Sequence, residues 1–403
     1  MLMSAMGAVV LEGPKACGKT MTAMQVARSA VRLDVDANGR AAAAIDPSLV
    51  REGAPPRLID EWQVEPSIWN HMRRQVGDRQ ANGQFLLAGS SVPAGDETRH
   101  TGAGRIARLR MRPMSLFESG HSTGMVSLSG LMSGQLARST DPGLDVPEIA
   151  TRVAVGGWPR FVDAPVDRAL TAMRAYVDEV RRTDVQRVSG VDHDPDRVLQ
   201  LMRSLARNVR TMTGVKTLAR DVAGTEGTID HKAAYTYYQA LERLMVIEDQ
   251  PAWGPHLRSK ARVRVTPKRR FVDPALAVAV LRATPDRLLD DLELLGFLFE
   301  SLVIRDLRIY AQAMDAQVLH YKDNTDLEVD AIIEAVDGRW GAVEVKLGPG
   351  MADQGAETLL AFVEKIDTKK CGPPSFLAVI TGFGLGYVRP DGIQVIPMGT
   401  LGP

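Results

Sequence analysis

The sequence has no long apolar run and very little cysteine. No apolar stretch among its 403 residues reaches the roughly 18–20 residues that a membrane span needs, so we expect no membrane partner. The first 15 residues also lack the charged leader and the cleavage pattern of a signal peptide. The two cysteines are Cys17 and Cys371, and Cys17 lies within a glycine-rich loop. This argues against a structural disulfide and predicts a reducing, cytoplasmic environment.

The sequence also has no net charge, because 49 basic residues balance 49 acidic ones. This balance argues against a uniformly basic surface that binds nucleic acid. Two local segments are nevertheless basic: residues 98–112 carry five arginines and no acid, and residues 253–270 carry seven lysines or arginines and no acid. Each segment can bind a phosphate backbone, or be an ordinary solvated loop.

Residues 13–20 read GPKACGKT and follow an apolar run at 8–11. Apolar residues then recur at helical spacing from 23 to 31, which predicts a helix there. A strand before and a helix after is the context of a phosphate-binding loop, in which Gly13 and Gly18 let backbone N–H groups face phosphate oxygens. Lys19 is expected between the β- and γ-phosphates, and Thr20 on Mg²⁺. The nucleotide-binding residues are predicted to be Gly13, Pro14, Lys15, Ala16, Cys17, Gly18, Lys19, Thr20 and Met21.

An acidic pair follows the next strand-like run, in RLIDEWQ at 57–63. We expect Asp60 to hold the Mg²⁺ and Glu61 to polarise the attacking water. A further apolar run at 85–88 ends near Ser90 and Ser91, where a hydroxyl can sense the γ-phosphate. The repeated order of strand, helix and strand predicts a parallel sheet with helices on both faces. The phosphate-binding loop and the acidic pair predict ATP and Mg²⁺ as cofactors.

These segments resemble the AAA+-like ATPases of the AAA_14 type. The resemblance rests on GPKACGKT, DPSLVREGAPPRLIDEWQVEPSIWN, GQFLLAGSS and GAGRIARLRMRPMSLFE. It implies that Ser90 or Ser91 is the sensor and that a C-terminal domain called DUF4143 follows. It also suggests a phosphate-contacting or intersubunit role for Arg105, with a purely structural role as the alternative.

The middle of the chain begins with an irregular connector at 119–145 and a helix at 167–182. Three further helices are predicted at 198–209, 215–223 and 229–245, followed by a strand-like run and the basic segment that ends at 270. Three helices and a β-hairpin form a winged helix-turn-helix. The basic wing favours DNA binding, and a packing or protein-interaction module is the alternative.

The C-terminal part predicts a long helix at 292–309, a strand at 329–335, a turn at 337–338 and a strand at 340–347. Glu344 and Lys346 are two residues apart on a strand and so face the same side, and Asp330 lies on the paired strand. This is the pattern of PD-(D/E)xK nucleases, in which two carboxylates bind Mg²⁺ and the lysine positions water. Glu300 can add a third carboxylate. The spacing of FES, EVDAII and AVEVK resembles DUF4143, and Gln354 matches a position that some such nucleases use.

The predicted fold class is therefore α/β, with a P-loop ATPase domain at 1–150, linker helices and a winged helix at 151–285, and a restriction-endonuclease-like domain at 286–403. The predicted function is Mg²⁺-dependent ATP hydrolysis coupled to a C-terminal half that engages DNA, with cleavage and oligomerisation left open. The alternative is an ATP-dependent regulator that binds DNA or protein without cutting. The predicted catalytic residues are Lys19, Glu61, Glu300, Asp330, Glu344 and Lys346, and the predicted metal ligands are Thr20, Asp60, Asp330 and Glu344.

Overall fold

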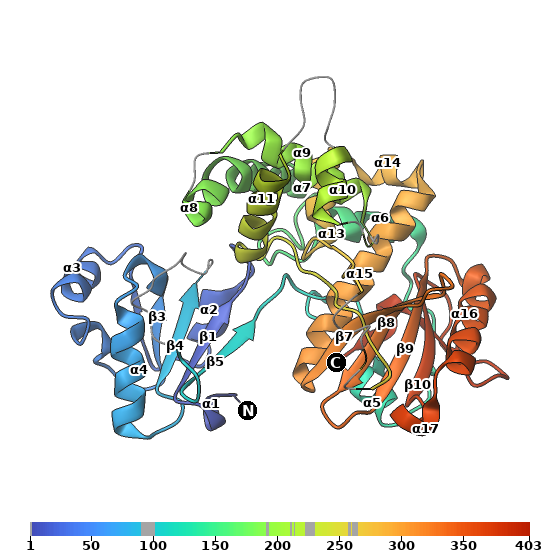
Figure 1. Ribbon diagram of the computed structural model, residues 1–403, viewed down its shortest axis with the longest axis horizontal. Helices are drawn as coiled ribbons and strands as arrows, with labels where there is room; N and C mark the ends of the chain where they lie inside the picture. Colours follow the sequence, from blue (N-terminus) through green and yellow to red (C-terminus); the bar gives the residue numbers. More distant parts are fainter. Residues whose placement is uncertain are drawn as a thin grey trace. The chain divides into compact units, whose positions relative to one another are not determined.

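The computed structural model describes residues 2–89, 101–190, 193–209, 212, 214–221, 230–256, 259 and 265–403 (Figure 1). The chain forms two compact units. The first comprises Met1–Pro113, Arg182–His193 and Gln239–Val246, and the second comprises Met114–Arg181, Asp194–Tyr238 and Ile247–Pro403. Within the described ranges, no helix combines the length and the apolar character that crossing a bilayer requires.

The first unit contains a five-stranded sheet in the order β2-β3-β4-β1-β5. All of its neighbouring strands pair in parallel, which confirms the predicted parallel α/β sheet. Its carboxyl ends therefore share one edge, where ligands of such sheets bind. The strands are β1 (Ala8–Glu12), β2 (Ser29–Arg32), β3 (Arg57–Asp60), β4 (Phe85–Gly89) and β5 (Ile106–Arg110), and the helices are α1 (Leu2–Ala5), α2 (Lys19–Met24), α3 (Ala37–Ile45), α4 (Ile68–Arg79) and α8 (Val185–Ser189), with 3₁₀ turns at Leu49–Arg51 and Trp62–Val64.

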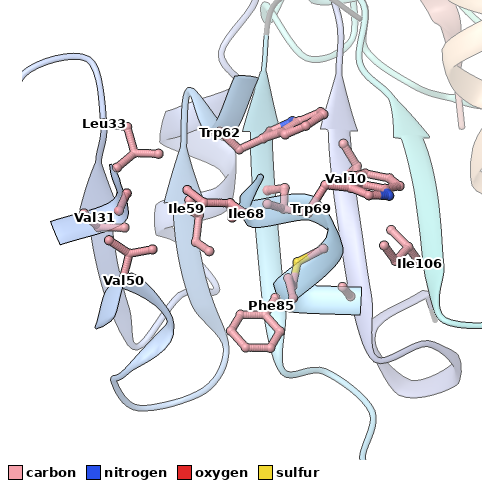
Figure 2. Packing of buried hydrophobic residues seen from close by; sticks show 14 of the residues in the cluster. Val10, Val31, Leu33, Val50, Ile59, Trp62, Ile68, Trp69, Phe85 and Ile106 are labelled. Carbon is pink, nitrogen blue, oxygen red and sulfur yellow. The ribbon is translucent and has the colours of Figure 1, made fainter. Parts of the chain in front are cut away.

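Alternate side chains of these strands enter two separate cores. Ala8 and Val10 of β1 join one buried cluster, whereas Val9 and Leu11 join another that includes Ala23 of α2. This alternation is what a strand covered on both faces requires. Figure 2 shows the first cluster, in which the rings of Trp62 and Trp69 pack in a tilted arrangement with their centroids 5.2 Å apart.

The helix predicted to run to residue 31 is shorter in the structure. Helix α2 ends at Met24, and residues Ser29–Arg32 form β2. Val31 is buried between two exposed neighbours and pairs with Ile59 of β3. Pairing with the buried strand β3 therefore imposes the alternation of buried and exposed side chains that is typical of a strand. This outweighs the helical spacing of the apolar residues at 23–31.

The second unit opens with helices that begin at strong capping sequences. Asp145, Asp194, Asp273 and Thr284 each accept a hydrogen bond from a backbone N–H of the first turn, and each of these helices has proline at its start. Side-chain caps and an initial proline both favour helix initiation. The helices before the sheet are α5 (Leu128–Met132), α6 (Val146–Val155), α7 (Val166–Glu179), α9 (Pro195–Arg207), α10 (Val215–Asp221), α13 (Pro274–Leu281) and α14 (Pro285–Leu289). Helix α11 (His231–Arg243) and the π-helical turn at Val180–Asp184 are each divided between the two units.

The C-terminal part of this unit is a six-stranded mixed sheet in the order β11-β12-β10-β9-β8-β7. The strands β7, β8 and β9 pair antiparallel, and β9, β10 and β12 pair in parallel. The predicted turn at 337–338 joins β8 to β9, with Gly338 at φ 86°. The elements are α15 (Leu292–Ala313), β7 (Ala316–Lys322), β8 (Glu328–Ala335), β9 (Trp340–Lys346), α16 (Ala352–Lys365), α17 (Thr368–Cys371), β10 (Phe376–Thr381), β11 (Tyr387–Val388) and β12 (Gln394–Pro397), and the short pair β6 (Val126–Ser127) and β13 (Leu401–Gly402) lies apart.

Two helices cover this mixed sheet. The long helix α15 packs on β7, and α16 packs on β9 and β10 (Figure 1). An aromatic cluster anchors the α16 side, where the ring centroids of Trp253 and Trp340 lie 5.2 Å apart and those of Tyr321 and Phe362 lie 4.7 Å apart. Such buried aromatic pairs fix the two elements against each other. The packing thereby places Glu300 of α15 and Glu344 of β9 within the same domain interior, where both are buried.

Candidate active site

The glycine-rich loop connects β1 to α2 at the carboxyl edge of the parallel sheet. Ala16 and Gly18 have positive φ values of 60° and 105°, which turn the backbone into the concave form that binds anions. Gly13 has no room for a side chain, because a Cβ there would lie 2.5 Å from the carbonyl oxygen of Met111. The loop is therefore shaped by its backbone, as a phosphate cradle requires.

Lys19 lies back across this loop. Its Nζ donates hydrogen bonds to the carbonyl oxygens of Gly13, at 2.9 Å, and Pro14, at 2.8 Å. The side chain is almost fully buried, and burial lowers the pKa of its ammonium. A buried cation at the mouth of an anion-binding loop supplies the positive charge that a triphosphate needs.

Thr20 and Asp60 meet at the same edge of the sheet. The Thr20 hydroxyl donates to the Asp60 carboxylate, with Oγ1 2.9 Å from Oδ2 and 3.1 Å from Oδ1. Asp60 ends β3 and is buried, which raises its pKa, although the bond from Thr20 opposes this shift. A hydroxyl and a carboxylate brought together beside the loop are hard oxygen donors of the kind that Mg²⁺ prefers. The residues at this position therefore fit a magnesium ion.

Glu61 has a backbone conformation that is rare for its residue type. Its φ is 52°, in the left-handed region, and its carboxylate accepts a short hydrogen bond from the Gln63 side chain. Burial raises the pKa of Glu61, while the nearby Lys19 opposes the shift. Strained residues of this kind persist where the surroundings hold them, which often happens at functional sites.

Three residues near the loop were not predicted from the sequence. Asp34 follows β2, and its charge contributes to the raised pKa values of both Asp60 and Glu61. Arg110 ends β5, opposite Glu12 in register, and its charge acts on Cys17 of the loop. The third is Asp184, which is buried and pairs with the predicted loop residue Lys15, with Lys15 Nζ 2.5 Å from Asp184 Oδ1. The sequence did carry a signal for Arg110, because arginines alternate at positions 108, 110 and 112. Residues two apart on a strand point to the same face of the sheet.

The remaining predicted residues of this site have different outcomes. Ser90 and Ser91 lie outside the described residues, so the sensor assignment stays a prediction. Arg105 lies at the opposite end of β1 from the loop, where its carbonyl accepts the N–H of Ala8 at 3.1 Å. Its guanidinium lies against Gly77 of α4. This position favours the structural alternative for Arg105 over phosphate contact within its own chain.

A second group of predicted residues converges in the C-terminal sheet. The Glu344 carboxylate accepts from the backbone N–H of Asp330 at 3.3 Å and from Lys346 Nζ at 3.0 Å, and Asp330 accepts from the N–H of Val345 at 3.0 Å. Burial raises the pKa of Glu344 to about 8, and the charges of Asp330 and Glu300 add to this effect. Gln354 lies on α16, as predicted, with an exposed side chain. The four residues Glu300, Asp330, Glu344 and Lys346 are thus brought together.

Two cations that the sequence did not point to enter the same cluster. Arg270 forms a short ion pair with Glu300 and donates to Ser301 Oγ at 3.2 Å. The Lys268 ammonium lies 3.7 Å from Glu300 Oε1 and 3.5 Å from Asp330 Oδ1. Both belong to the segment that was expected to form an exposed basic wing, and both are buried instead. Among the described residues, no group of three or more His, Cys, Asp or Glu side chains is arranged to hold a metal ion.

His320 of β7 is a buried neighbour of these two cations. Burial lowers its pKa to about 3, and the charges of Lys268 and Arg270 reinforce the effect. Because the folded pKa lies below the unfolded value of about 6.5, the unfolded chain binds the extra proton, and stability is lost as the pH falls. We expect the unfolding free energy to fall between pH 6.5 and 4 by up to about 1.4 kcal/mol per pH unit more in the wild type than in a His320→Leu variant. Urea denaturation at several pH values measures this difference, and parallel pH profiles would contradict it.

Comparisons with known proteins match three segments of the chain. Residues 6–119 match the family model of an AAA domain, AAA_14. Residues 146–287 and 295–401 match two domains of unknown function, DUF8612 and DUF4143. No curated protein matches the sequence. The Walker-type ATPase PABY2304 of Pyrococcus abyssi is a similar solved structure, with 13% identity and a TM-score of 0.41 over 70% of this chain and 92% of that one. The chain thus combines an N-terminal AAA domain of the AAA_14 type with a C-terminal DUF4143 domain.

Proposed function

We propose that the first unit binds ATP with Mg²⁺ and hydrolyses it. The observation that carries this proposal is the contact between the Thr20 hydroxyl and the Asp60 carboxylate beside the glycine-rich loop. In P-loop NTPases, side chains of these two types hold the Mg²⁺ that bridges the phosphates. The match of residues 6–119 to an AAA domain supports ATP as the nucleotide.

The residues of the chain divide the work of hydrolysis among them. Backbone N–H groups of the loop bind phosphate oxygens, and the Lys19 ammonium exchanges its two loop carbonyls for oxygens of the β- and γ-phosphates. Thr20 and Asp60 would hold Mg²⁺, which neutralises phosphate charge when it is bound. Glu61 orients the attacking water and accepts its proton, and burial has already raised the pKa of this carboxyl toward that of a useful base.

A Glu61→Gln variant tests this assignment. The amide keeps the shape of the side chain but cannot accept a proton, so we expect ATP affinity within about threefold of the wild type and turnover lower by about 10²–10⁴-fold. Fluorescent ATP binding and phosphate release measure the two quantities. Glu52→Gln, at an exposed position of the same unit, is the matched control and should leave both unchanged. Full turnover in the Glu61→Gln variant would remove Glu61 from the mechanism.

For the middle and C-terminal parts of the chain we propose a winged helix followed by a nuclease-like domain. The order α9, α10, α11 and the antiparallel bridges Ile247–Phe271 and Gln250–Lys268 support the first. The order α15-β7-β8-β9-α16-β10 and the convergence of Asp330 with Glu344 support the second.

The cations in the acidic cluster favour the alternative in which this domain does not cut. Lys268 and Arg270 face carboxylates, and Arg269 lies over the ring of Tyr238 at 5.1 Å. In these positions none of the three cations is directed to bind a DNA phosphate. DNA engagement stays a prediction that depends on the other cations of the basic segment, Arg258, Lys260, Arg262 and Arg264, which lie outside the described residues.

A further inference from the structure

The Lys268 ammonium lies among three carboxylates, of which those of Glu300 and Asp330 are buried and that of Glu328 is partly exposed. Its Nζ is 3.5 Å from Asp330 Oδ1, 3.7 Å from Glu300 Oε1 and 3.9 Å from Glu328 Oε2, and the side chain is fully buried. These separations are ion-pair distances, and Nζ makes no hydrogen bond within the described residues. A buried ammonium that lies between several carboxylate oxygens without hydrogen-bonding to them interacts with them through its charge.

The backbone fixes Lys268 in this position. Lys268 and Gln250 exchange two backbone hydrogen bonds, of 2.8 and 3.1 Å. The Gln250 side chain in turn donates to the carbonyls of Leu319 and Asp330, at 3.0 and 2.9 Å, and accepts from Arg270 Nε at 3.0 Å. Gln250 thus ties the segment that carries both cations to β7 and β8, the strands that border the cluster.

The charges and the space around Lys268 exclude a second cation. Glu300 and Asp330 are already paired with Arg270 and Lys268, which leaves little net negative charge to attract a metal ion. Mg²⁺ and Mn²⁺ also require oxygen ligands at roughly 2.0–2.2 Å, and the ammonium fills the space between those oxygens. In this conformation the carboxylates therefore do not fit a metal.

We propose that Lys268 is the resident cation of this cluster and takes the place of a divalent metal, so that the unaltered chain binds none between Glu300, Glu328 and Asp330. Removal of the ammonium would leave these carboxylates of α15 and β8 without their central cation, with the negative charge that attracts Mn²⁺. This inference goes beyond the ATPase function and does not depend on it.

The test is Mn²⁺ binding by the full chain without nucleotide, measured by electron paramagnetic resonance and by the shift in melting temperature. We expect Lys268→Met to melt at a lower temperature than the wild type, because it leaves a buried carboxylate uncompensated, and to regain several degrees on adding Mn²⁺. In the wild type this cluster should contribute neither bound Mn²⁺ nor a shift, so that any Mn²⁺ bound at Thr20 and Asp60 is unaffected by Asp330→Asn. Lys322→Met is the matched control, because Lys322 also pairs with Glu328, at 2.8 Å, but is partly exposed at the edge of the cluster.

Further variants locate the site and guard against misfolding. Adding Asp330→Asn to Lys268→Met should abolish the gained Mn²⁺ binding. If Lys268→Met does not fold, Lys268→Met with Glu300→Gln removes one charge of each sign and should bind Mn²⁺ through Asp330 and Glu328. The proposal is overturned if the wild type binds Mn²⁺ in a manner that Asp330→Asn abolishes. It is equally overturned if neither folded Lys268 variant gains binding.

Discussion

A Lys19→Ala variant is expected to lose ATP binding while keeping its fold. The Lys19 ammonium is the buried cation of the phosphate-binding loop, and hydrogen bonds to charged groups contribute about 1.5–3 kcal/mol each. Loss of one or two such bonds to the triphosphate weakens affinity by roughly 10- to 10³-fold, and turnover should fall by at least about 10²-fold. Isothermal titration with a non-hydrolysable ATP analogue measures the affinity directly.

Two controls separate loss of binding from loss of structure. Arg28→Ala removes an exposed cation just beyond α2 and should bind the analogue as the wild type does. The melting temperature of Lys19→Ala without nucleotide should not fall, because within the described residues the lysine donates hydrogen bonds to two loop carbonyls alone, and its removal ends the cost of burying a charge. Unchanged affinity in Lys19→Ala would place the nucleotide elsewhere.

The second large effect is expected at Arg305, which is buried in α15 between two carboxylates. Arg305 Nη1 lies 2.7 Å from Asp273 Oδ2, and Nε lies 2.7 Å from Asp306 Oδ1. Burial raises the pKa of Asp306 to about 6 even though Arg305 opposes the shift. Arg305→Leu leaves both buried carboxylates without a cation, and we expect this to lower the unfolding free energy by about 3–5 kcal/mol. Urea denaturation of the full chain measures this loss.

The same two carboxylates also anchor backbone segments. Asp273 Oδ2 accepts the N–H of Gly157 at 3.0 Å, and Asp306 accepts the N–H of Leu116 at 2.8 Å. Arg305→Lys keeps the charge but loses the planar guanidinium that bonds both carboxylates. We therefore expect its unfolding free energy to lie between those of the wild type and Arg305→Leu. A Leu variant as stable as the wild type would show that this network contributes little.

Local motifs carried most of what the sequence revealed. The glycine-rich loop, Asp60 at a strand end and the hairpin that carries Asp330 and Glu344 can each be recognised from spacing within a few residues. In the structure the loop joins β1 to α2, Asp60 ends β3, and β8 and β9 form the hairpin. The helix expected to reach residue 31 failed because pairing with β3, which is remote in sequence, decided the conformation of Val31.

The parts that could not be predicted depend on contacts between distant residues. Lys268 meets Glu300 and Asp330 across 32 and 62 positions of the chain, and nothing in the basic segment distinguishes a cation that faces solvent from one that fills an acidic cluster. Alternation with Arg270 indicates only that the two share a side of an extended segment. The pairing of Lys15 with Asp184 could not be predicted for the same reason, because the two residues are 169 positions apart in the chain.

The central claim, that this chain is a Mg²⁺-dependent ATPase, is tested most directly by phosphate release from saturating ATP. The purified full chain is assayed with Mg²⁺ and again with excess EDTA, beside an Asp60→Asn variant that keeps the shape of the metal-binding side chain. We predict turnover that requires Mg²⁺ and falls by at least about 10²-fold in Asp60→Asn. Turnover that persists in EDTA, or that Asp60→Asn leaves intact, would contradict the account.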